Sequence, residues 1–352
     1  MSQLYNKIVI TKKGGIENLK LIQEDKNQLY KNLKQNEAII KVYTAGLAYA
    51  DIMMREGTYP GHPPYPFTPG YDIIGQIEYI QENPFHLKKG NFVGALTVTG
   101  GYSEYIKLPI EKLMPISYIN KNHKIPDIKE CAELVSLILN YITAYQLLFR
   151  IKKLNSDSYI LIHGGGGGVG TALIQLTQYY GFKNTYTTIS KRKYDLIQQY
   201  NVKPIFYQEE SFVEYCKKNH ILMDLILDPI GGMHFLDSYK ILNKNGVLVL
   251  YGTYNFLKQG TLKSMAGVPL TYLRNLFSFN RKKVVFYLIG QKKFGGYNSV
   301  KEDFSILVEL YKNKHIQPII DTIYPLTEEN VKIAHKRLQE GDVRGKIVFR
   351  ML

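Results

Sequence analysis

The residues best suited to chemistry in this sequence of 352 residues are a run of glycines that follows a short apolar stretch. Residues 159–162 have the composition of a strand, five consecutive glycines come soon after, and Gly165, Gly167 and Gly170 have the G-x-G-x-x-G spacing. Glycines at this spacing permit a tight turn, a close approach of the backbone to a pyrophosphate, and the packing of a helix on the strand. The phosphates would lie at the helix N-terminus, where free N–H groups and the helix dipole favour anions. The candidate pyrophosphate turn comprises Gly164, Gly165, Gly166, Gly167, Gly168, Val169 and Gly170.

The residues after this turn favour a dinucleotide site over the alternative, an ordinary flexible glycine loop. Residues 171–180 have a helical pattern and residues 185–189 that of a second strand, so a strand, a helix and a strand follow one another within about thirty residues. At the end of the second strand an NAD site would have an acidic residue, whereas this chain has Ser190, Lys191, Arg192 and Lys193. Cations there suit a 2′-phosphate and predict NADPH as the cofactor; a solvated basic turn would have the same composition.

The length and composition of the chain indicate its number of domains and the class of protein. The chain is longer than one compact core usually organises, so two domains are expected. The N-terminal residues lack the apolar core of a secretory signal, and the sequence has no run of eighteen apolar residues, so we expect a cytoplasmic protein. The two cysteines, Cys131 and Cys216, can form neither a disulfide framework nor a four-thiolate zinc lobe.

Two patterns divide the chain. The first third has short strands at residues 8–10, 37–43, 73–80, 91–95 and 102–106 with no helical period, and a proline-rich loop at 60–69 that carries Tyr59 and His62. Strands then alternate with helices, which predicts a parallel sheet. A helix is expected at 128–149 and strands at 159–162, 185–189, 204–207, 223–228 and 246–251, with a possible sixth strand at 284–289. The tail has a helix, a strand, a helix and a strand at 304–313, 318–324, 328–339 and 346–349.

Several motifs, in this order along the chain, resemble the medium-chain dehydrogenase/reductase superfamily and, within it, the quinone oxidoreductase branch. They are residues 45–51 (AGLAYAD), 55–60 (REGTYP), 66–75 (PFTPGYDIIG), 101–105 (GYSEY) and the glycine turn. Residues 139–145, 227–232 and 314–318 look like the subgroup typified by the synaptic vesicle amine transport protein homologue. The resemblance covers almost the whole chain. It implies a Rossmann domain with a doubly wound parallel sheet, inserted into a GroES-like, β-rich catalytic domain, with the active site in the cleft.

The implied domains are residues 1–126 and 298–352 for the catalytic domain and residues 127–297 for the Rossmann domain. Zinc-dependent members of the superfamily have a cysteine at the position of Ala48 and a His-Glu pair at the positions of Tyr71 and Asp72. Without thiolate and imidazole ligands, no tetrahedral catalytic zinc site is expected. Reduction of a polarised C=C bond, which needs mainly hydride positioning and a proton source, is therefore favoured over reduction of a carbonyl.

The resemblance also assigns cofactor residues outside the glycine turn. It places Thr143 at the nicotinamide half, Ser190 and Lys193 at the 2′-phosphate, and Tyr207 on the adenosine side. Tyr251 and Gly252 would lie at the far end of the cofactor. Lys193 matches the lysine of the family, Arg192 is an addition in this chain, and Ala48 stands where the quinone reductases usually have an asparagine next to the nicotinamide.

For catalysis the resemblance singles out Tyr59, because related enoyl thioester reductases have their proposed proton donor at the matching Gly-x-Tyr. A positioned phenol can protonate a developing enolate, although a tyrosine beside Pro60 can also simply pack. Tyr49 and Asp51 would line the same cleft, and Asp51 could equally cap a helix. His62 and His163 have no recognisable partner in the sequence and are expected to be structural.

The positive charge is concentrated between residues 238 and 301, which contain eleven Lys or Arg and no Asp or Glu, against a net charge of +15 for the chain. This basic segment could attract anionic lipid or a phosphorylated substrate such as an acyl-CoA, or only solvate the surface; nucleic acid is disfavoured because no RNA-binding motif is present.

These patterns together predict a zinc-independent NADPH-dependent oxidoreductase, either a quinone oxidoreductase or an alkene reductase. It would transfer hydride to a quinone or to an activated C=C bond in an enone or enoyl acceptor. A homodimer would form through an edge strand at 284–289. The alternative is an NADPH-binding, lipid- or membrane-associated protein with little turnover, like the vesicle amine transport homologue.

Overall fold

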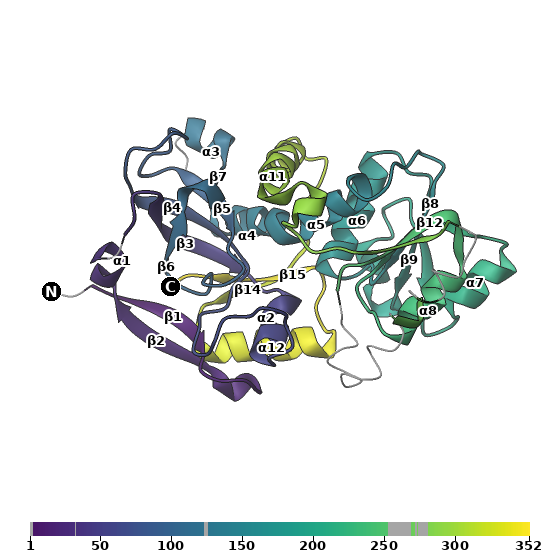
Figure 1. The fold of residues 1–352 in the computed structure, drawn as a ribbon, viewed down its shortest axis with the longest axis horizontal. Coiled ribbons are helices and arrows are strands. Elements are labelled where there is room, and N and C mark those ends of the chain that lie inside the picture. The colour runs from purple at the N-terminus through teal and green to yellow at the C-terminus, as the bar shows by residue number, and fades with distance from the viewer. Residues whose placement is uncertain (1–2, 32, 123–125, 253–268, 272, 274–280) are drawn as a thin grey trace. The chain divides into compact units, whose positions relative to one another are not determined.

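The computed structural model of the chain describes residues 3–31, 33–122, 126–252, 269–271, 273 and 281–352, and it divides into two compact units (Figure 1). Unit 1 comprises residues 1–139, 304–312 and 318–352, and unit 2 comprises residues 140–303 and 313–317. These bounds differ from the expected boundaries after residues 126 and 297. The reason at the first boundary is that helix α4 (Ile128–Ser136) packs on strands of unit 1. At the second, helix α11 (Gly296–Lys312) passes from one unit to the other along its length.

Unit 2 is built on a parallel sheet of six strands. They are β8 (Tyr159–His163), β9 (Asn184–Ile189), β10 (Lys203–Phe206), β11 (Met223–Asp228), β12 (Leu242–Leu250) and β13 (Lys283–Phe286). Their spatial order is β10-β9-β8-β11-β12-β13, and every neighbouring pair is parallel. Counted along the chain this is the order 3-2-1-4-5-6 of a doubly wound sheet, in which the winding reverses between β8 and β11. The predicted doubly wound sheet is confirmed, and the possible sixth strand is its edge strand β13.

Helices cover both faces of this sheet because its strands are apolar on both sides. On one face, α7 (Phe212–Lys218) and α8 (Met233–Lys240) bury Phe212, Phe235 and Tyr239 in a cluster with Leu161 and Ile226. On the other side lie α6 (Gly168–Tyr179) and α5 (Ile142–Phe149), as Figure 1 shows. Unit 2 also contains two short 3-10 helices, η4 (Lys191–Leu196) and η5 (Lys292–Phe294).

Unit 1 is β-rich, and its main sheet contains seven strands. The path is β14 (Ile320–Pro325), β15 (Lys346–Arg350), β3 (Glu37–Gly46), β4 (Asp72–Ile80), β5 (Phe92–Leu96) and β7 (Met114–Pro115), and β6 (Tyr105–Pro109) also pairs with β3. A separate hairpin joins β1 (Leu4–Ile10) to β2 (Leu19–Asp25). The C-terminal strand β15 is antiparallel to β3, so the tail of the chain completes the sheet begun near the N-terminus.

The helices of unit 1 reveal what the sequence pattern missed. Besides α4 and part of α11 they are α1 (Asn27–Lys31), α2 (Tyr49–Arg55), α3 (Ser117–Asn122) and α12 (Glu328–Glu340), with 3-10 turns at Ile16–Asn18 and Ile110–Lys112. The first third shows no helical period in the sequence, yet α1 and α2 lie there, because helices of five and seven residues are too short to show a period. Strand β2 was also missed, and β6 begins later than expected.

Helices α4 and α5 are joined by a π-helical turn at Leu137–Tyr141 into one helical stretch, Ile128–Phe149. By length and composition this stretch could cross a membrane, and 83% of its most apolar window is buried inside the protein. A core helix passes the same test of length and composition, so the stretch is weak evidence for a membrane span.

Candidate active site

The glycine turn in unit 2 has the geometry of an anion site. Gly164 has a φ of +74°, and the N–H of Gly167 donates to its carbonyl at 3.0 Å. Helix α6 then begins at Gly168, with Gly167 as an N-cap that has no side chain to bond the first N–H groups. A Cβ atom on Gly170 would lie 2.2 Å from the carbonyl oxygen of Gly164, so only glycine fits there. The turn therefore presents helix N–H groups to an external acceptor such as a phosphate.

Lys193 lies against this turn. A Cβ atom on Gly166 would come within 2.7 Å of Cδ of Lys193, so the lysine stem covers the glycine. The lysine belongs to η4, which starts directly after β9 with the buried Ser190 as its N-cap. Arg192 is exposed, and Lys191 forms an ion pair with Glu209. Lys193, one of the cations expected at a 2′-phosphate, thus contacts the glycine turn.

A buried polar network spans the point where the sheet reverses its winding. His163 ends β8 and contacts Thr188 Oγ1 and Ser238 Oγ, both at 3.1 Å. Ser238 donates to Asp228 at the end of β11 (3.2 Å), and Asp228 also contacts Nδ1 of His234 at 2.8 Å. The expectation that His163 has no partner is therefore wrong, because its partners lie 25 and 75 residues away in the sequence. This network holds the ends of β8 and β11 together beside the turn.

Burial and hydrogen bonding set the charges in this network. Burial lowers the pKa of His163 to about 3, so its ring is neutral. Burial alone would raise the pKa of Asp228, but the hydrogen bond and charge of His234 and the N–H of Gly231 outweigh it and lower the pKa to about 2. His163, Asp228 and His234 have ligand atoms within 4.8 Å of one another, close enough for a metal ion. All three side chains already form hydrogen bonds within the network, which fits a structural role.

The other residues assigned to the cofactor lie in unit 2 as well. Thr143 is buried on α5, and on the same helix Gln146 Oε1 accepts a hydrogen bond at 2.8 Å from the hydroxyl of Tyr287, next to the edge strand β13. Tyr207 follows β10 and is 60% exposed, which leaves its ring free to stack on a planar group. Tyr251 follows β12, and its N–H donates to the carbonyl of Asp228. A Cβ atom on Gly252 would lie 2.9 Å from the carbonyl oxygen of Pro229, so this loop approaches the one after β11 closely.

The residues assigned to catalysis lie in unit 1. Tyr59 follows α2 and its hydroxyl lies 2.8 Å from the hydroxyl of Tyr71. Tyr49 is the first residue of α2 and is half-buried. Asp51 is fully buried and accepts hydrogen bonds from the N–H groups of Ala48 and Gly70 and from the hydroxyl of Tyr102. Burial raises the pKa of Asp51 to about 7 against these three donors. Asp51 therefore caps α2 and holds the loop before β4, and this capping role was the alternative to a place in the cleft.

The positions that hold zinc ligands in zinc-dependent members of the superfamily have other residue types in this chain. Ala48 is the N-cap of α2, and the Tyr71 ring is buried against Tyr59. Asp72, at the position of the family glutamate, forms a buried ion pair with Lys346, whose Nζ lies 3.0 Å from Oδ2. The sequence pattern missed Lys346, because the pair joins residues 274 positions apart. Tyr71, Asp72 and Lys346 thus offer oxygen and ammonium groups rather than the sulfur and imidazole ligands that zinc prefers.

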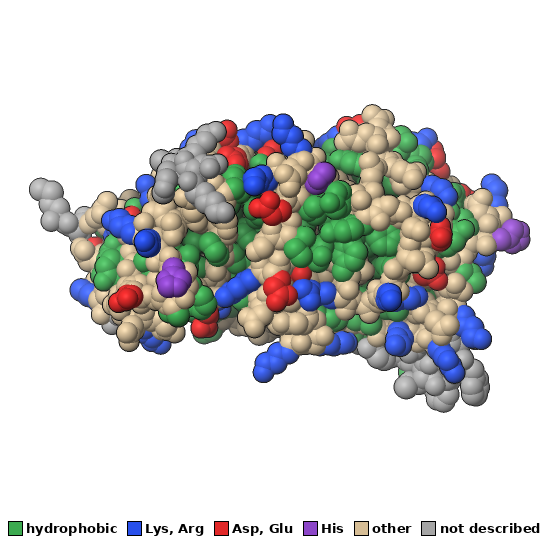
Figure 2. All heavy atoms as spheres, turned by 90° about the horizontal axis from the view of Figure 1, so that it is seen from above, with side chains coloured by type: hydrophobic (Ala, Val, Ile, Leu, Met, Phe, Trp, Pro, Cys, Tyr) green, Lys and Arg blue, Asp and Glu red, His purple; other side chains and the backbone are tan. Residues whose placement is uncertain are grey.

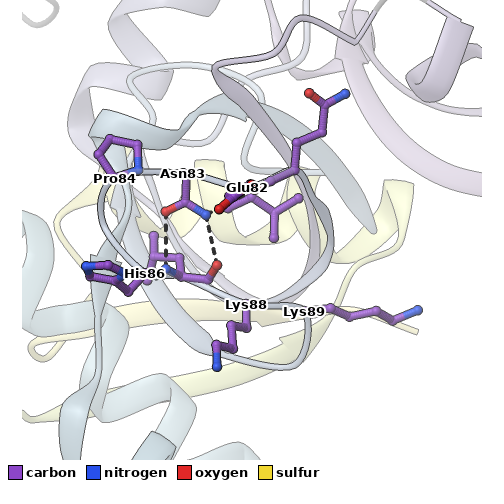
Figure 3. Close-up of a pocket in the computed structure, with 9 residues that line it drawn as sticks. Glu82, Asn83, Pro84, His86, Lys88 and Lys89 are labelled. Carbon is purple, nitrogen blue, oxygen red and sulfur yellow. Dashed lines mark hydrogen bonds between the residues drawn. The ribbon is translucent and has the colours of Figure 1, made fainter.

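Among the described residues, the remaining surface features do not point to a second site. On the face drawn in Figure 2, the described Lys and Arg side chains lie dispersed among acidic, apolar and other groups. Lys258, Lys263 and Arg274 of the basic segment lie outside the described residues, as do most of the residues from 265 to 279, which are mainly apolar. An open pocket of about 750 Å³ lies in the loop between β4 and β5, where Asn83 bonds the backbone of Leu87 (Figure 3). None of the residues assigned to cofactor or catalysis lines it.

A 3-2-1-4-5-6 parallel sheet with a glycine turn at its reversal point defines the class of dinucleotide-binding α/β proteins. Comparisons with known proteins agree. Residues 34–118 match the family model described as alcohol dehydrogenase GroES-like domain, and residues 202–349 match the model described as zinc-binding dehydrogenase. The synaptic vesicle membrane protein VAT-1 homolog of Danio rerio is 31% identical over 98% of this chain and 70% of its own length. The quinone oxidoreductase of Homo sapiens is 25% identical over 90% of this chain and 89% of its own length.

Solved structures have the same fold. A mycobacterial structure complexed with NADPH superposes with a TM-score of 0.80 at 21% identity, covering 98% of this chain and 99% of that one. The CurK enoyl reductase superposes with a TM-score of 0.81 at 19% identity, covering 99% of each chain. The chain belongs to the medium-chain dehydrogenase/reductase superfamily and, within it, to the quinone oxidoreductase-like group that includes the VAT-1 homologues. This membership supports an oxidoreductase with a nicotinamide cofactor.

Proposed function

We propose that the protein is a zinc-independent reductase that uses NADPH to reduce a quinone or an activated C=C bond. The observation that supports the cofactor choice is the contact of Lys193 with Gly166 in the glycine turn, because an NAD site would have a carboxylate at the end of the second strand. NADPH in a structure of the same fold supports the same choice. When bound, NADPH would supply the hydride.

The choice of acceptor rests on the chemistry of unit 1. Ala48, Tyr71 and the Asp72–Lys346 pair provide no set of sulfur and nitrogen ligands for zinc, so a carbonyl acceptor would lack a Lewis acid. The Tyr59 hydroxyl provides a proton donor, which an enone, an enoyl group or a quinone requires after hydride addition. The relatives named quinone oxidoreductase and enoyl reductase support this class of acceptor.

A second function is favoured by the relatives named synaptic vesicle membrane proteins. In this alternative the chain binds NADPH but works mainly at an anionic membrane surface. The test measures NADPH oxidation with a panel of quinones and enones beside co-sedimentation with acidic vesicles. Turnover without sedimentation supports the reductase, and sedimentation without turnover supports the membrane function.

We further propose a cytoplasmic homodimer formed through β13, whose Phe286 is 40% exposed at the edge of the sheet.

A further inference from the structure

The hydroxyl groups of Tyr59 and Tyr71 form a pair inside unit 1. Their oxygens are 2.8 Å apart, and the rings meet edge to face with centroids 6.4 Å apart. The Tyr71 side chain is buried, whereas Tyr59 keeps part of its surface exposed. Each phenol has one proton, so at any moment one hydroxyl donates to the other.

The backbone holds both members of the pair in place. The carbonyl of Tyr71 accepts from the N–H groups of Thr97 at 2.9 Å and Val98 at 3.2 Å. The N–H of Tyr59 donates to the carbonyl of Met53 at 3.2 Å. Backbone hydrogen bonds therefore fix Tyr71 just before β4, and its hydroxyl contacts the partly exposed phenol of Tyr59.

We propose that Tyr71 is a positioning residue for proton donation by Tyr59. This inference rests on the proposed function. After hydride addition to the C=C bond, Tyr59 would give its hydroxyl proton to the α-carbon of the resulting enolate. The O–H bond breaks, a C–H bond forms, and the electron pair stays on the Tyr59 oxygen as a phenolate. The Tyr71 O–H donates a hydrogen bond to this phenolate until a solvent proton restores it.

The hydrogen bond between Tyr71 and Tyr59 affects the pKa of Tyr59. Burial raises the pKa of Tyr59, the hydrogen bond from Tyr71 opposes that rise, and the charge of the nearby Asp51 reinforces it. Ionised Asp51 therefore disfavours a phenolate at Tyr59, and the hydrogen bond from Tyr71 favours it. Hydrogen bonds to a charged group contribute more than neutral ones.

The test replaces Tyr71 by phenylalanine, which removes only the hydroxyl. With NADPH and an enone, Tyr71→Phe is expected to lower kcat by about tenfold with little change in KM, because the bond to the phenolate forms after substrate binding. The basic limb of the kcat profile should move to higher pH. Tyr65→Phe is the matched control, because this nearby phenol donates to the carbonyl of Met54 instead. An unchanged kcat and pH profile in Tyr71→Phe would overturn the proposal.

A second readout separates this inference from the proposed function. Fluorotyrosine placed at position 59 can be titrated by ¹⁹F NMR without any substrate. Its pKa should be higher in the Tyr71→Phe protein than in the protein with Tyr71 intact and unchanged in Tyr65→Phe. If no acceptor is reduced yet this pKa rises, the reductase proposal fails while the hydroxyl coupling stands. If the two pKa values are equal, the positioning role of Tyr71 is refuted whatever the activity.

Discussion

Lys346 Nζ lies 3.0 Å from Asp72 Oδ2, and both side chains are almost completely buried. The pair joins β15 to the start of β4, and the side chains leave no room for a Cβ atom on Gly46, which would lie 2.3 Å from Lys346 Cε. The pair thus links the C-terminal strand β15 to β4, a strand of the same sheet that comes from the first third of the chain.

Removing one partner of this pair should be costly. Lys346→Met is expected to lower the free energy of unfolding by about 3–5 kcal/mol, because it leaves the Asp72 charge buried and unpaired. The double variant Asp72→Asn with Lys346→Met should recover part of that loss. Urea unfolding measures both. Equal losses in the single and double variants would show that the pair is not coupled.

His335 should make the stability depend on pH. Its ring is fully buried, and neither nitrogen has a hydrogen-bond partner in the described part of the chain. Burial, aided by the charge of Arg55, lowers the pKa of His335 to about 3, below the unfolded value near 6.5. The unfolded chain therefore binds the extra proton between these values, and stability falls as the pH drops through this window.

His335→Leu removes that titration. The stability gained over the wild-type protein should grow on acidification below about pH 6.5, by on the order of 1 kcal/mol per pH unit. Thermal or urea unfolding at several pH values measures this difference. A difference that stays constant from neutral to acidic pH would refute the buried neutral imidazole.

The glycine turn offers a matched pair of substitutions. Gly170→Ala places a methyl group 2.2 Å from the Gly164 carbonyl oxygen and should destabilise unit 2 by about 1–3 kcal/mol while abolishing NADPH binding. Gly167→Ala places its methyl group 3.4 Å from the same oxygen and should fold normally. Fluorescence titration and thermal unfolding compare the two. Normal cofactor binding by Gly170→Ala would contradict the turn geometry.

Lys193→Ala should erode the preference for NADPH. Charge-assisted bonds to phosphate contribute about 1.5–3 kcal/mol, so the NADPH affinity should fall by about tenfold or more while the NADH affinity stays nearly constant. Lys191→Ala is the control, because that lysine pairs with Glu209. Equal affinities of the unmodified protein for NADPH and NADH would exclude the 2′-phosphate assignment.

The sequence predicted those features that have a local signature. The glycine spacing and the alternation of strands and helices led to the doubly wound sheet. The position of Lys193 after the second strand led to its assignment to a 2′-phosphate, which stays a prediction. Pairings between distant residues had no such signature: the partners of His163 and the Lys346–Asp72 pair become visible only when strands are placed side by side. Helix α2 was missed because its seven residues are too few for apolar residues to repeat along one helix face.

The most direct test of the proposed reductase follows deuterium from cofactor to product in protein freed of metal by exhaustive chelation. The protein is incubated with NADPH deuterated at the transferable position and with enone or quinone acceptors. The account predicts that the metal-free protein oxidises NADPH and that an enone product contains one deuterium per NADPH consumed, bound to carbon. NADPH that binds tightly but transfers no deuterium to any acceptor, or transfer that requires stoichiometric zinc, would contradict it.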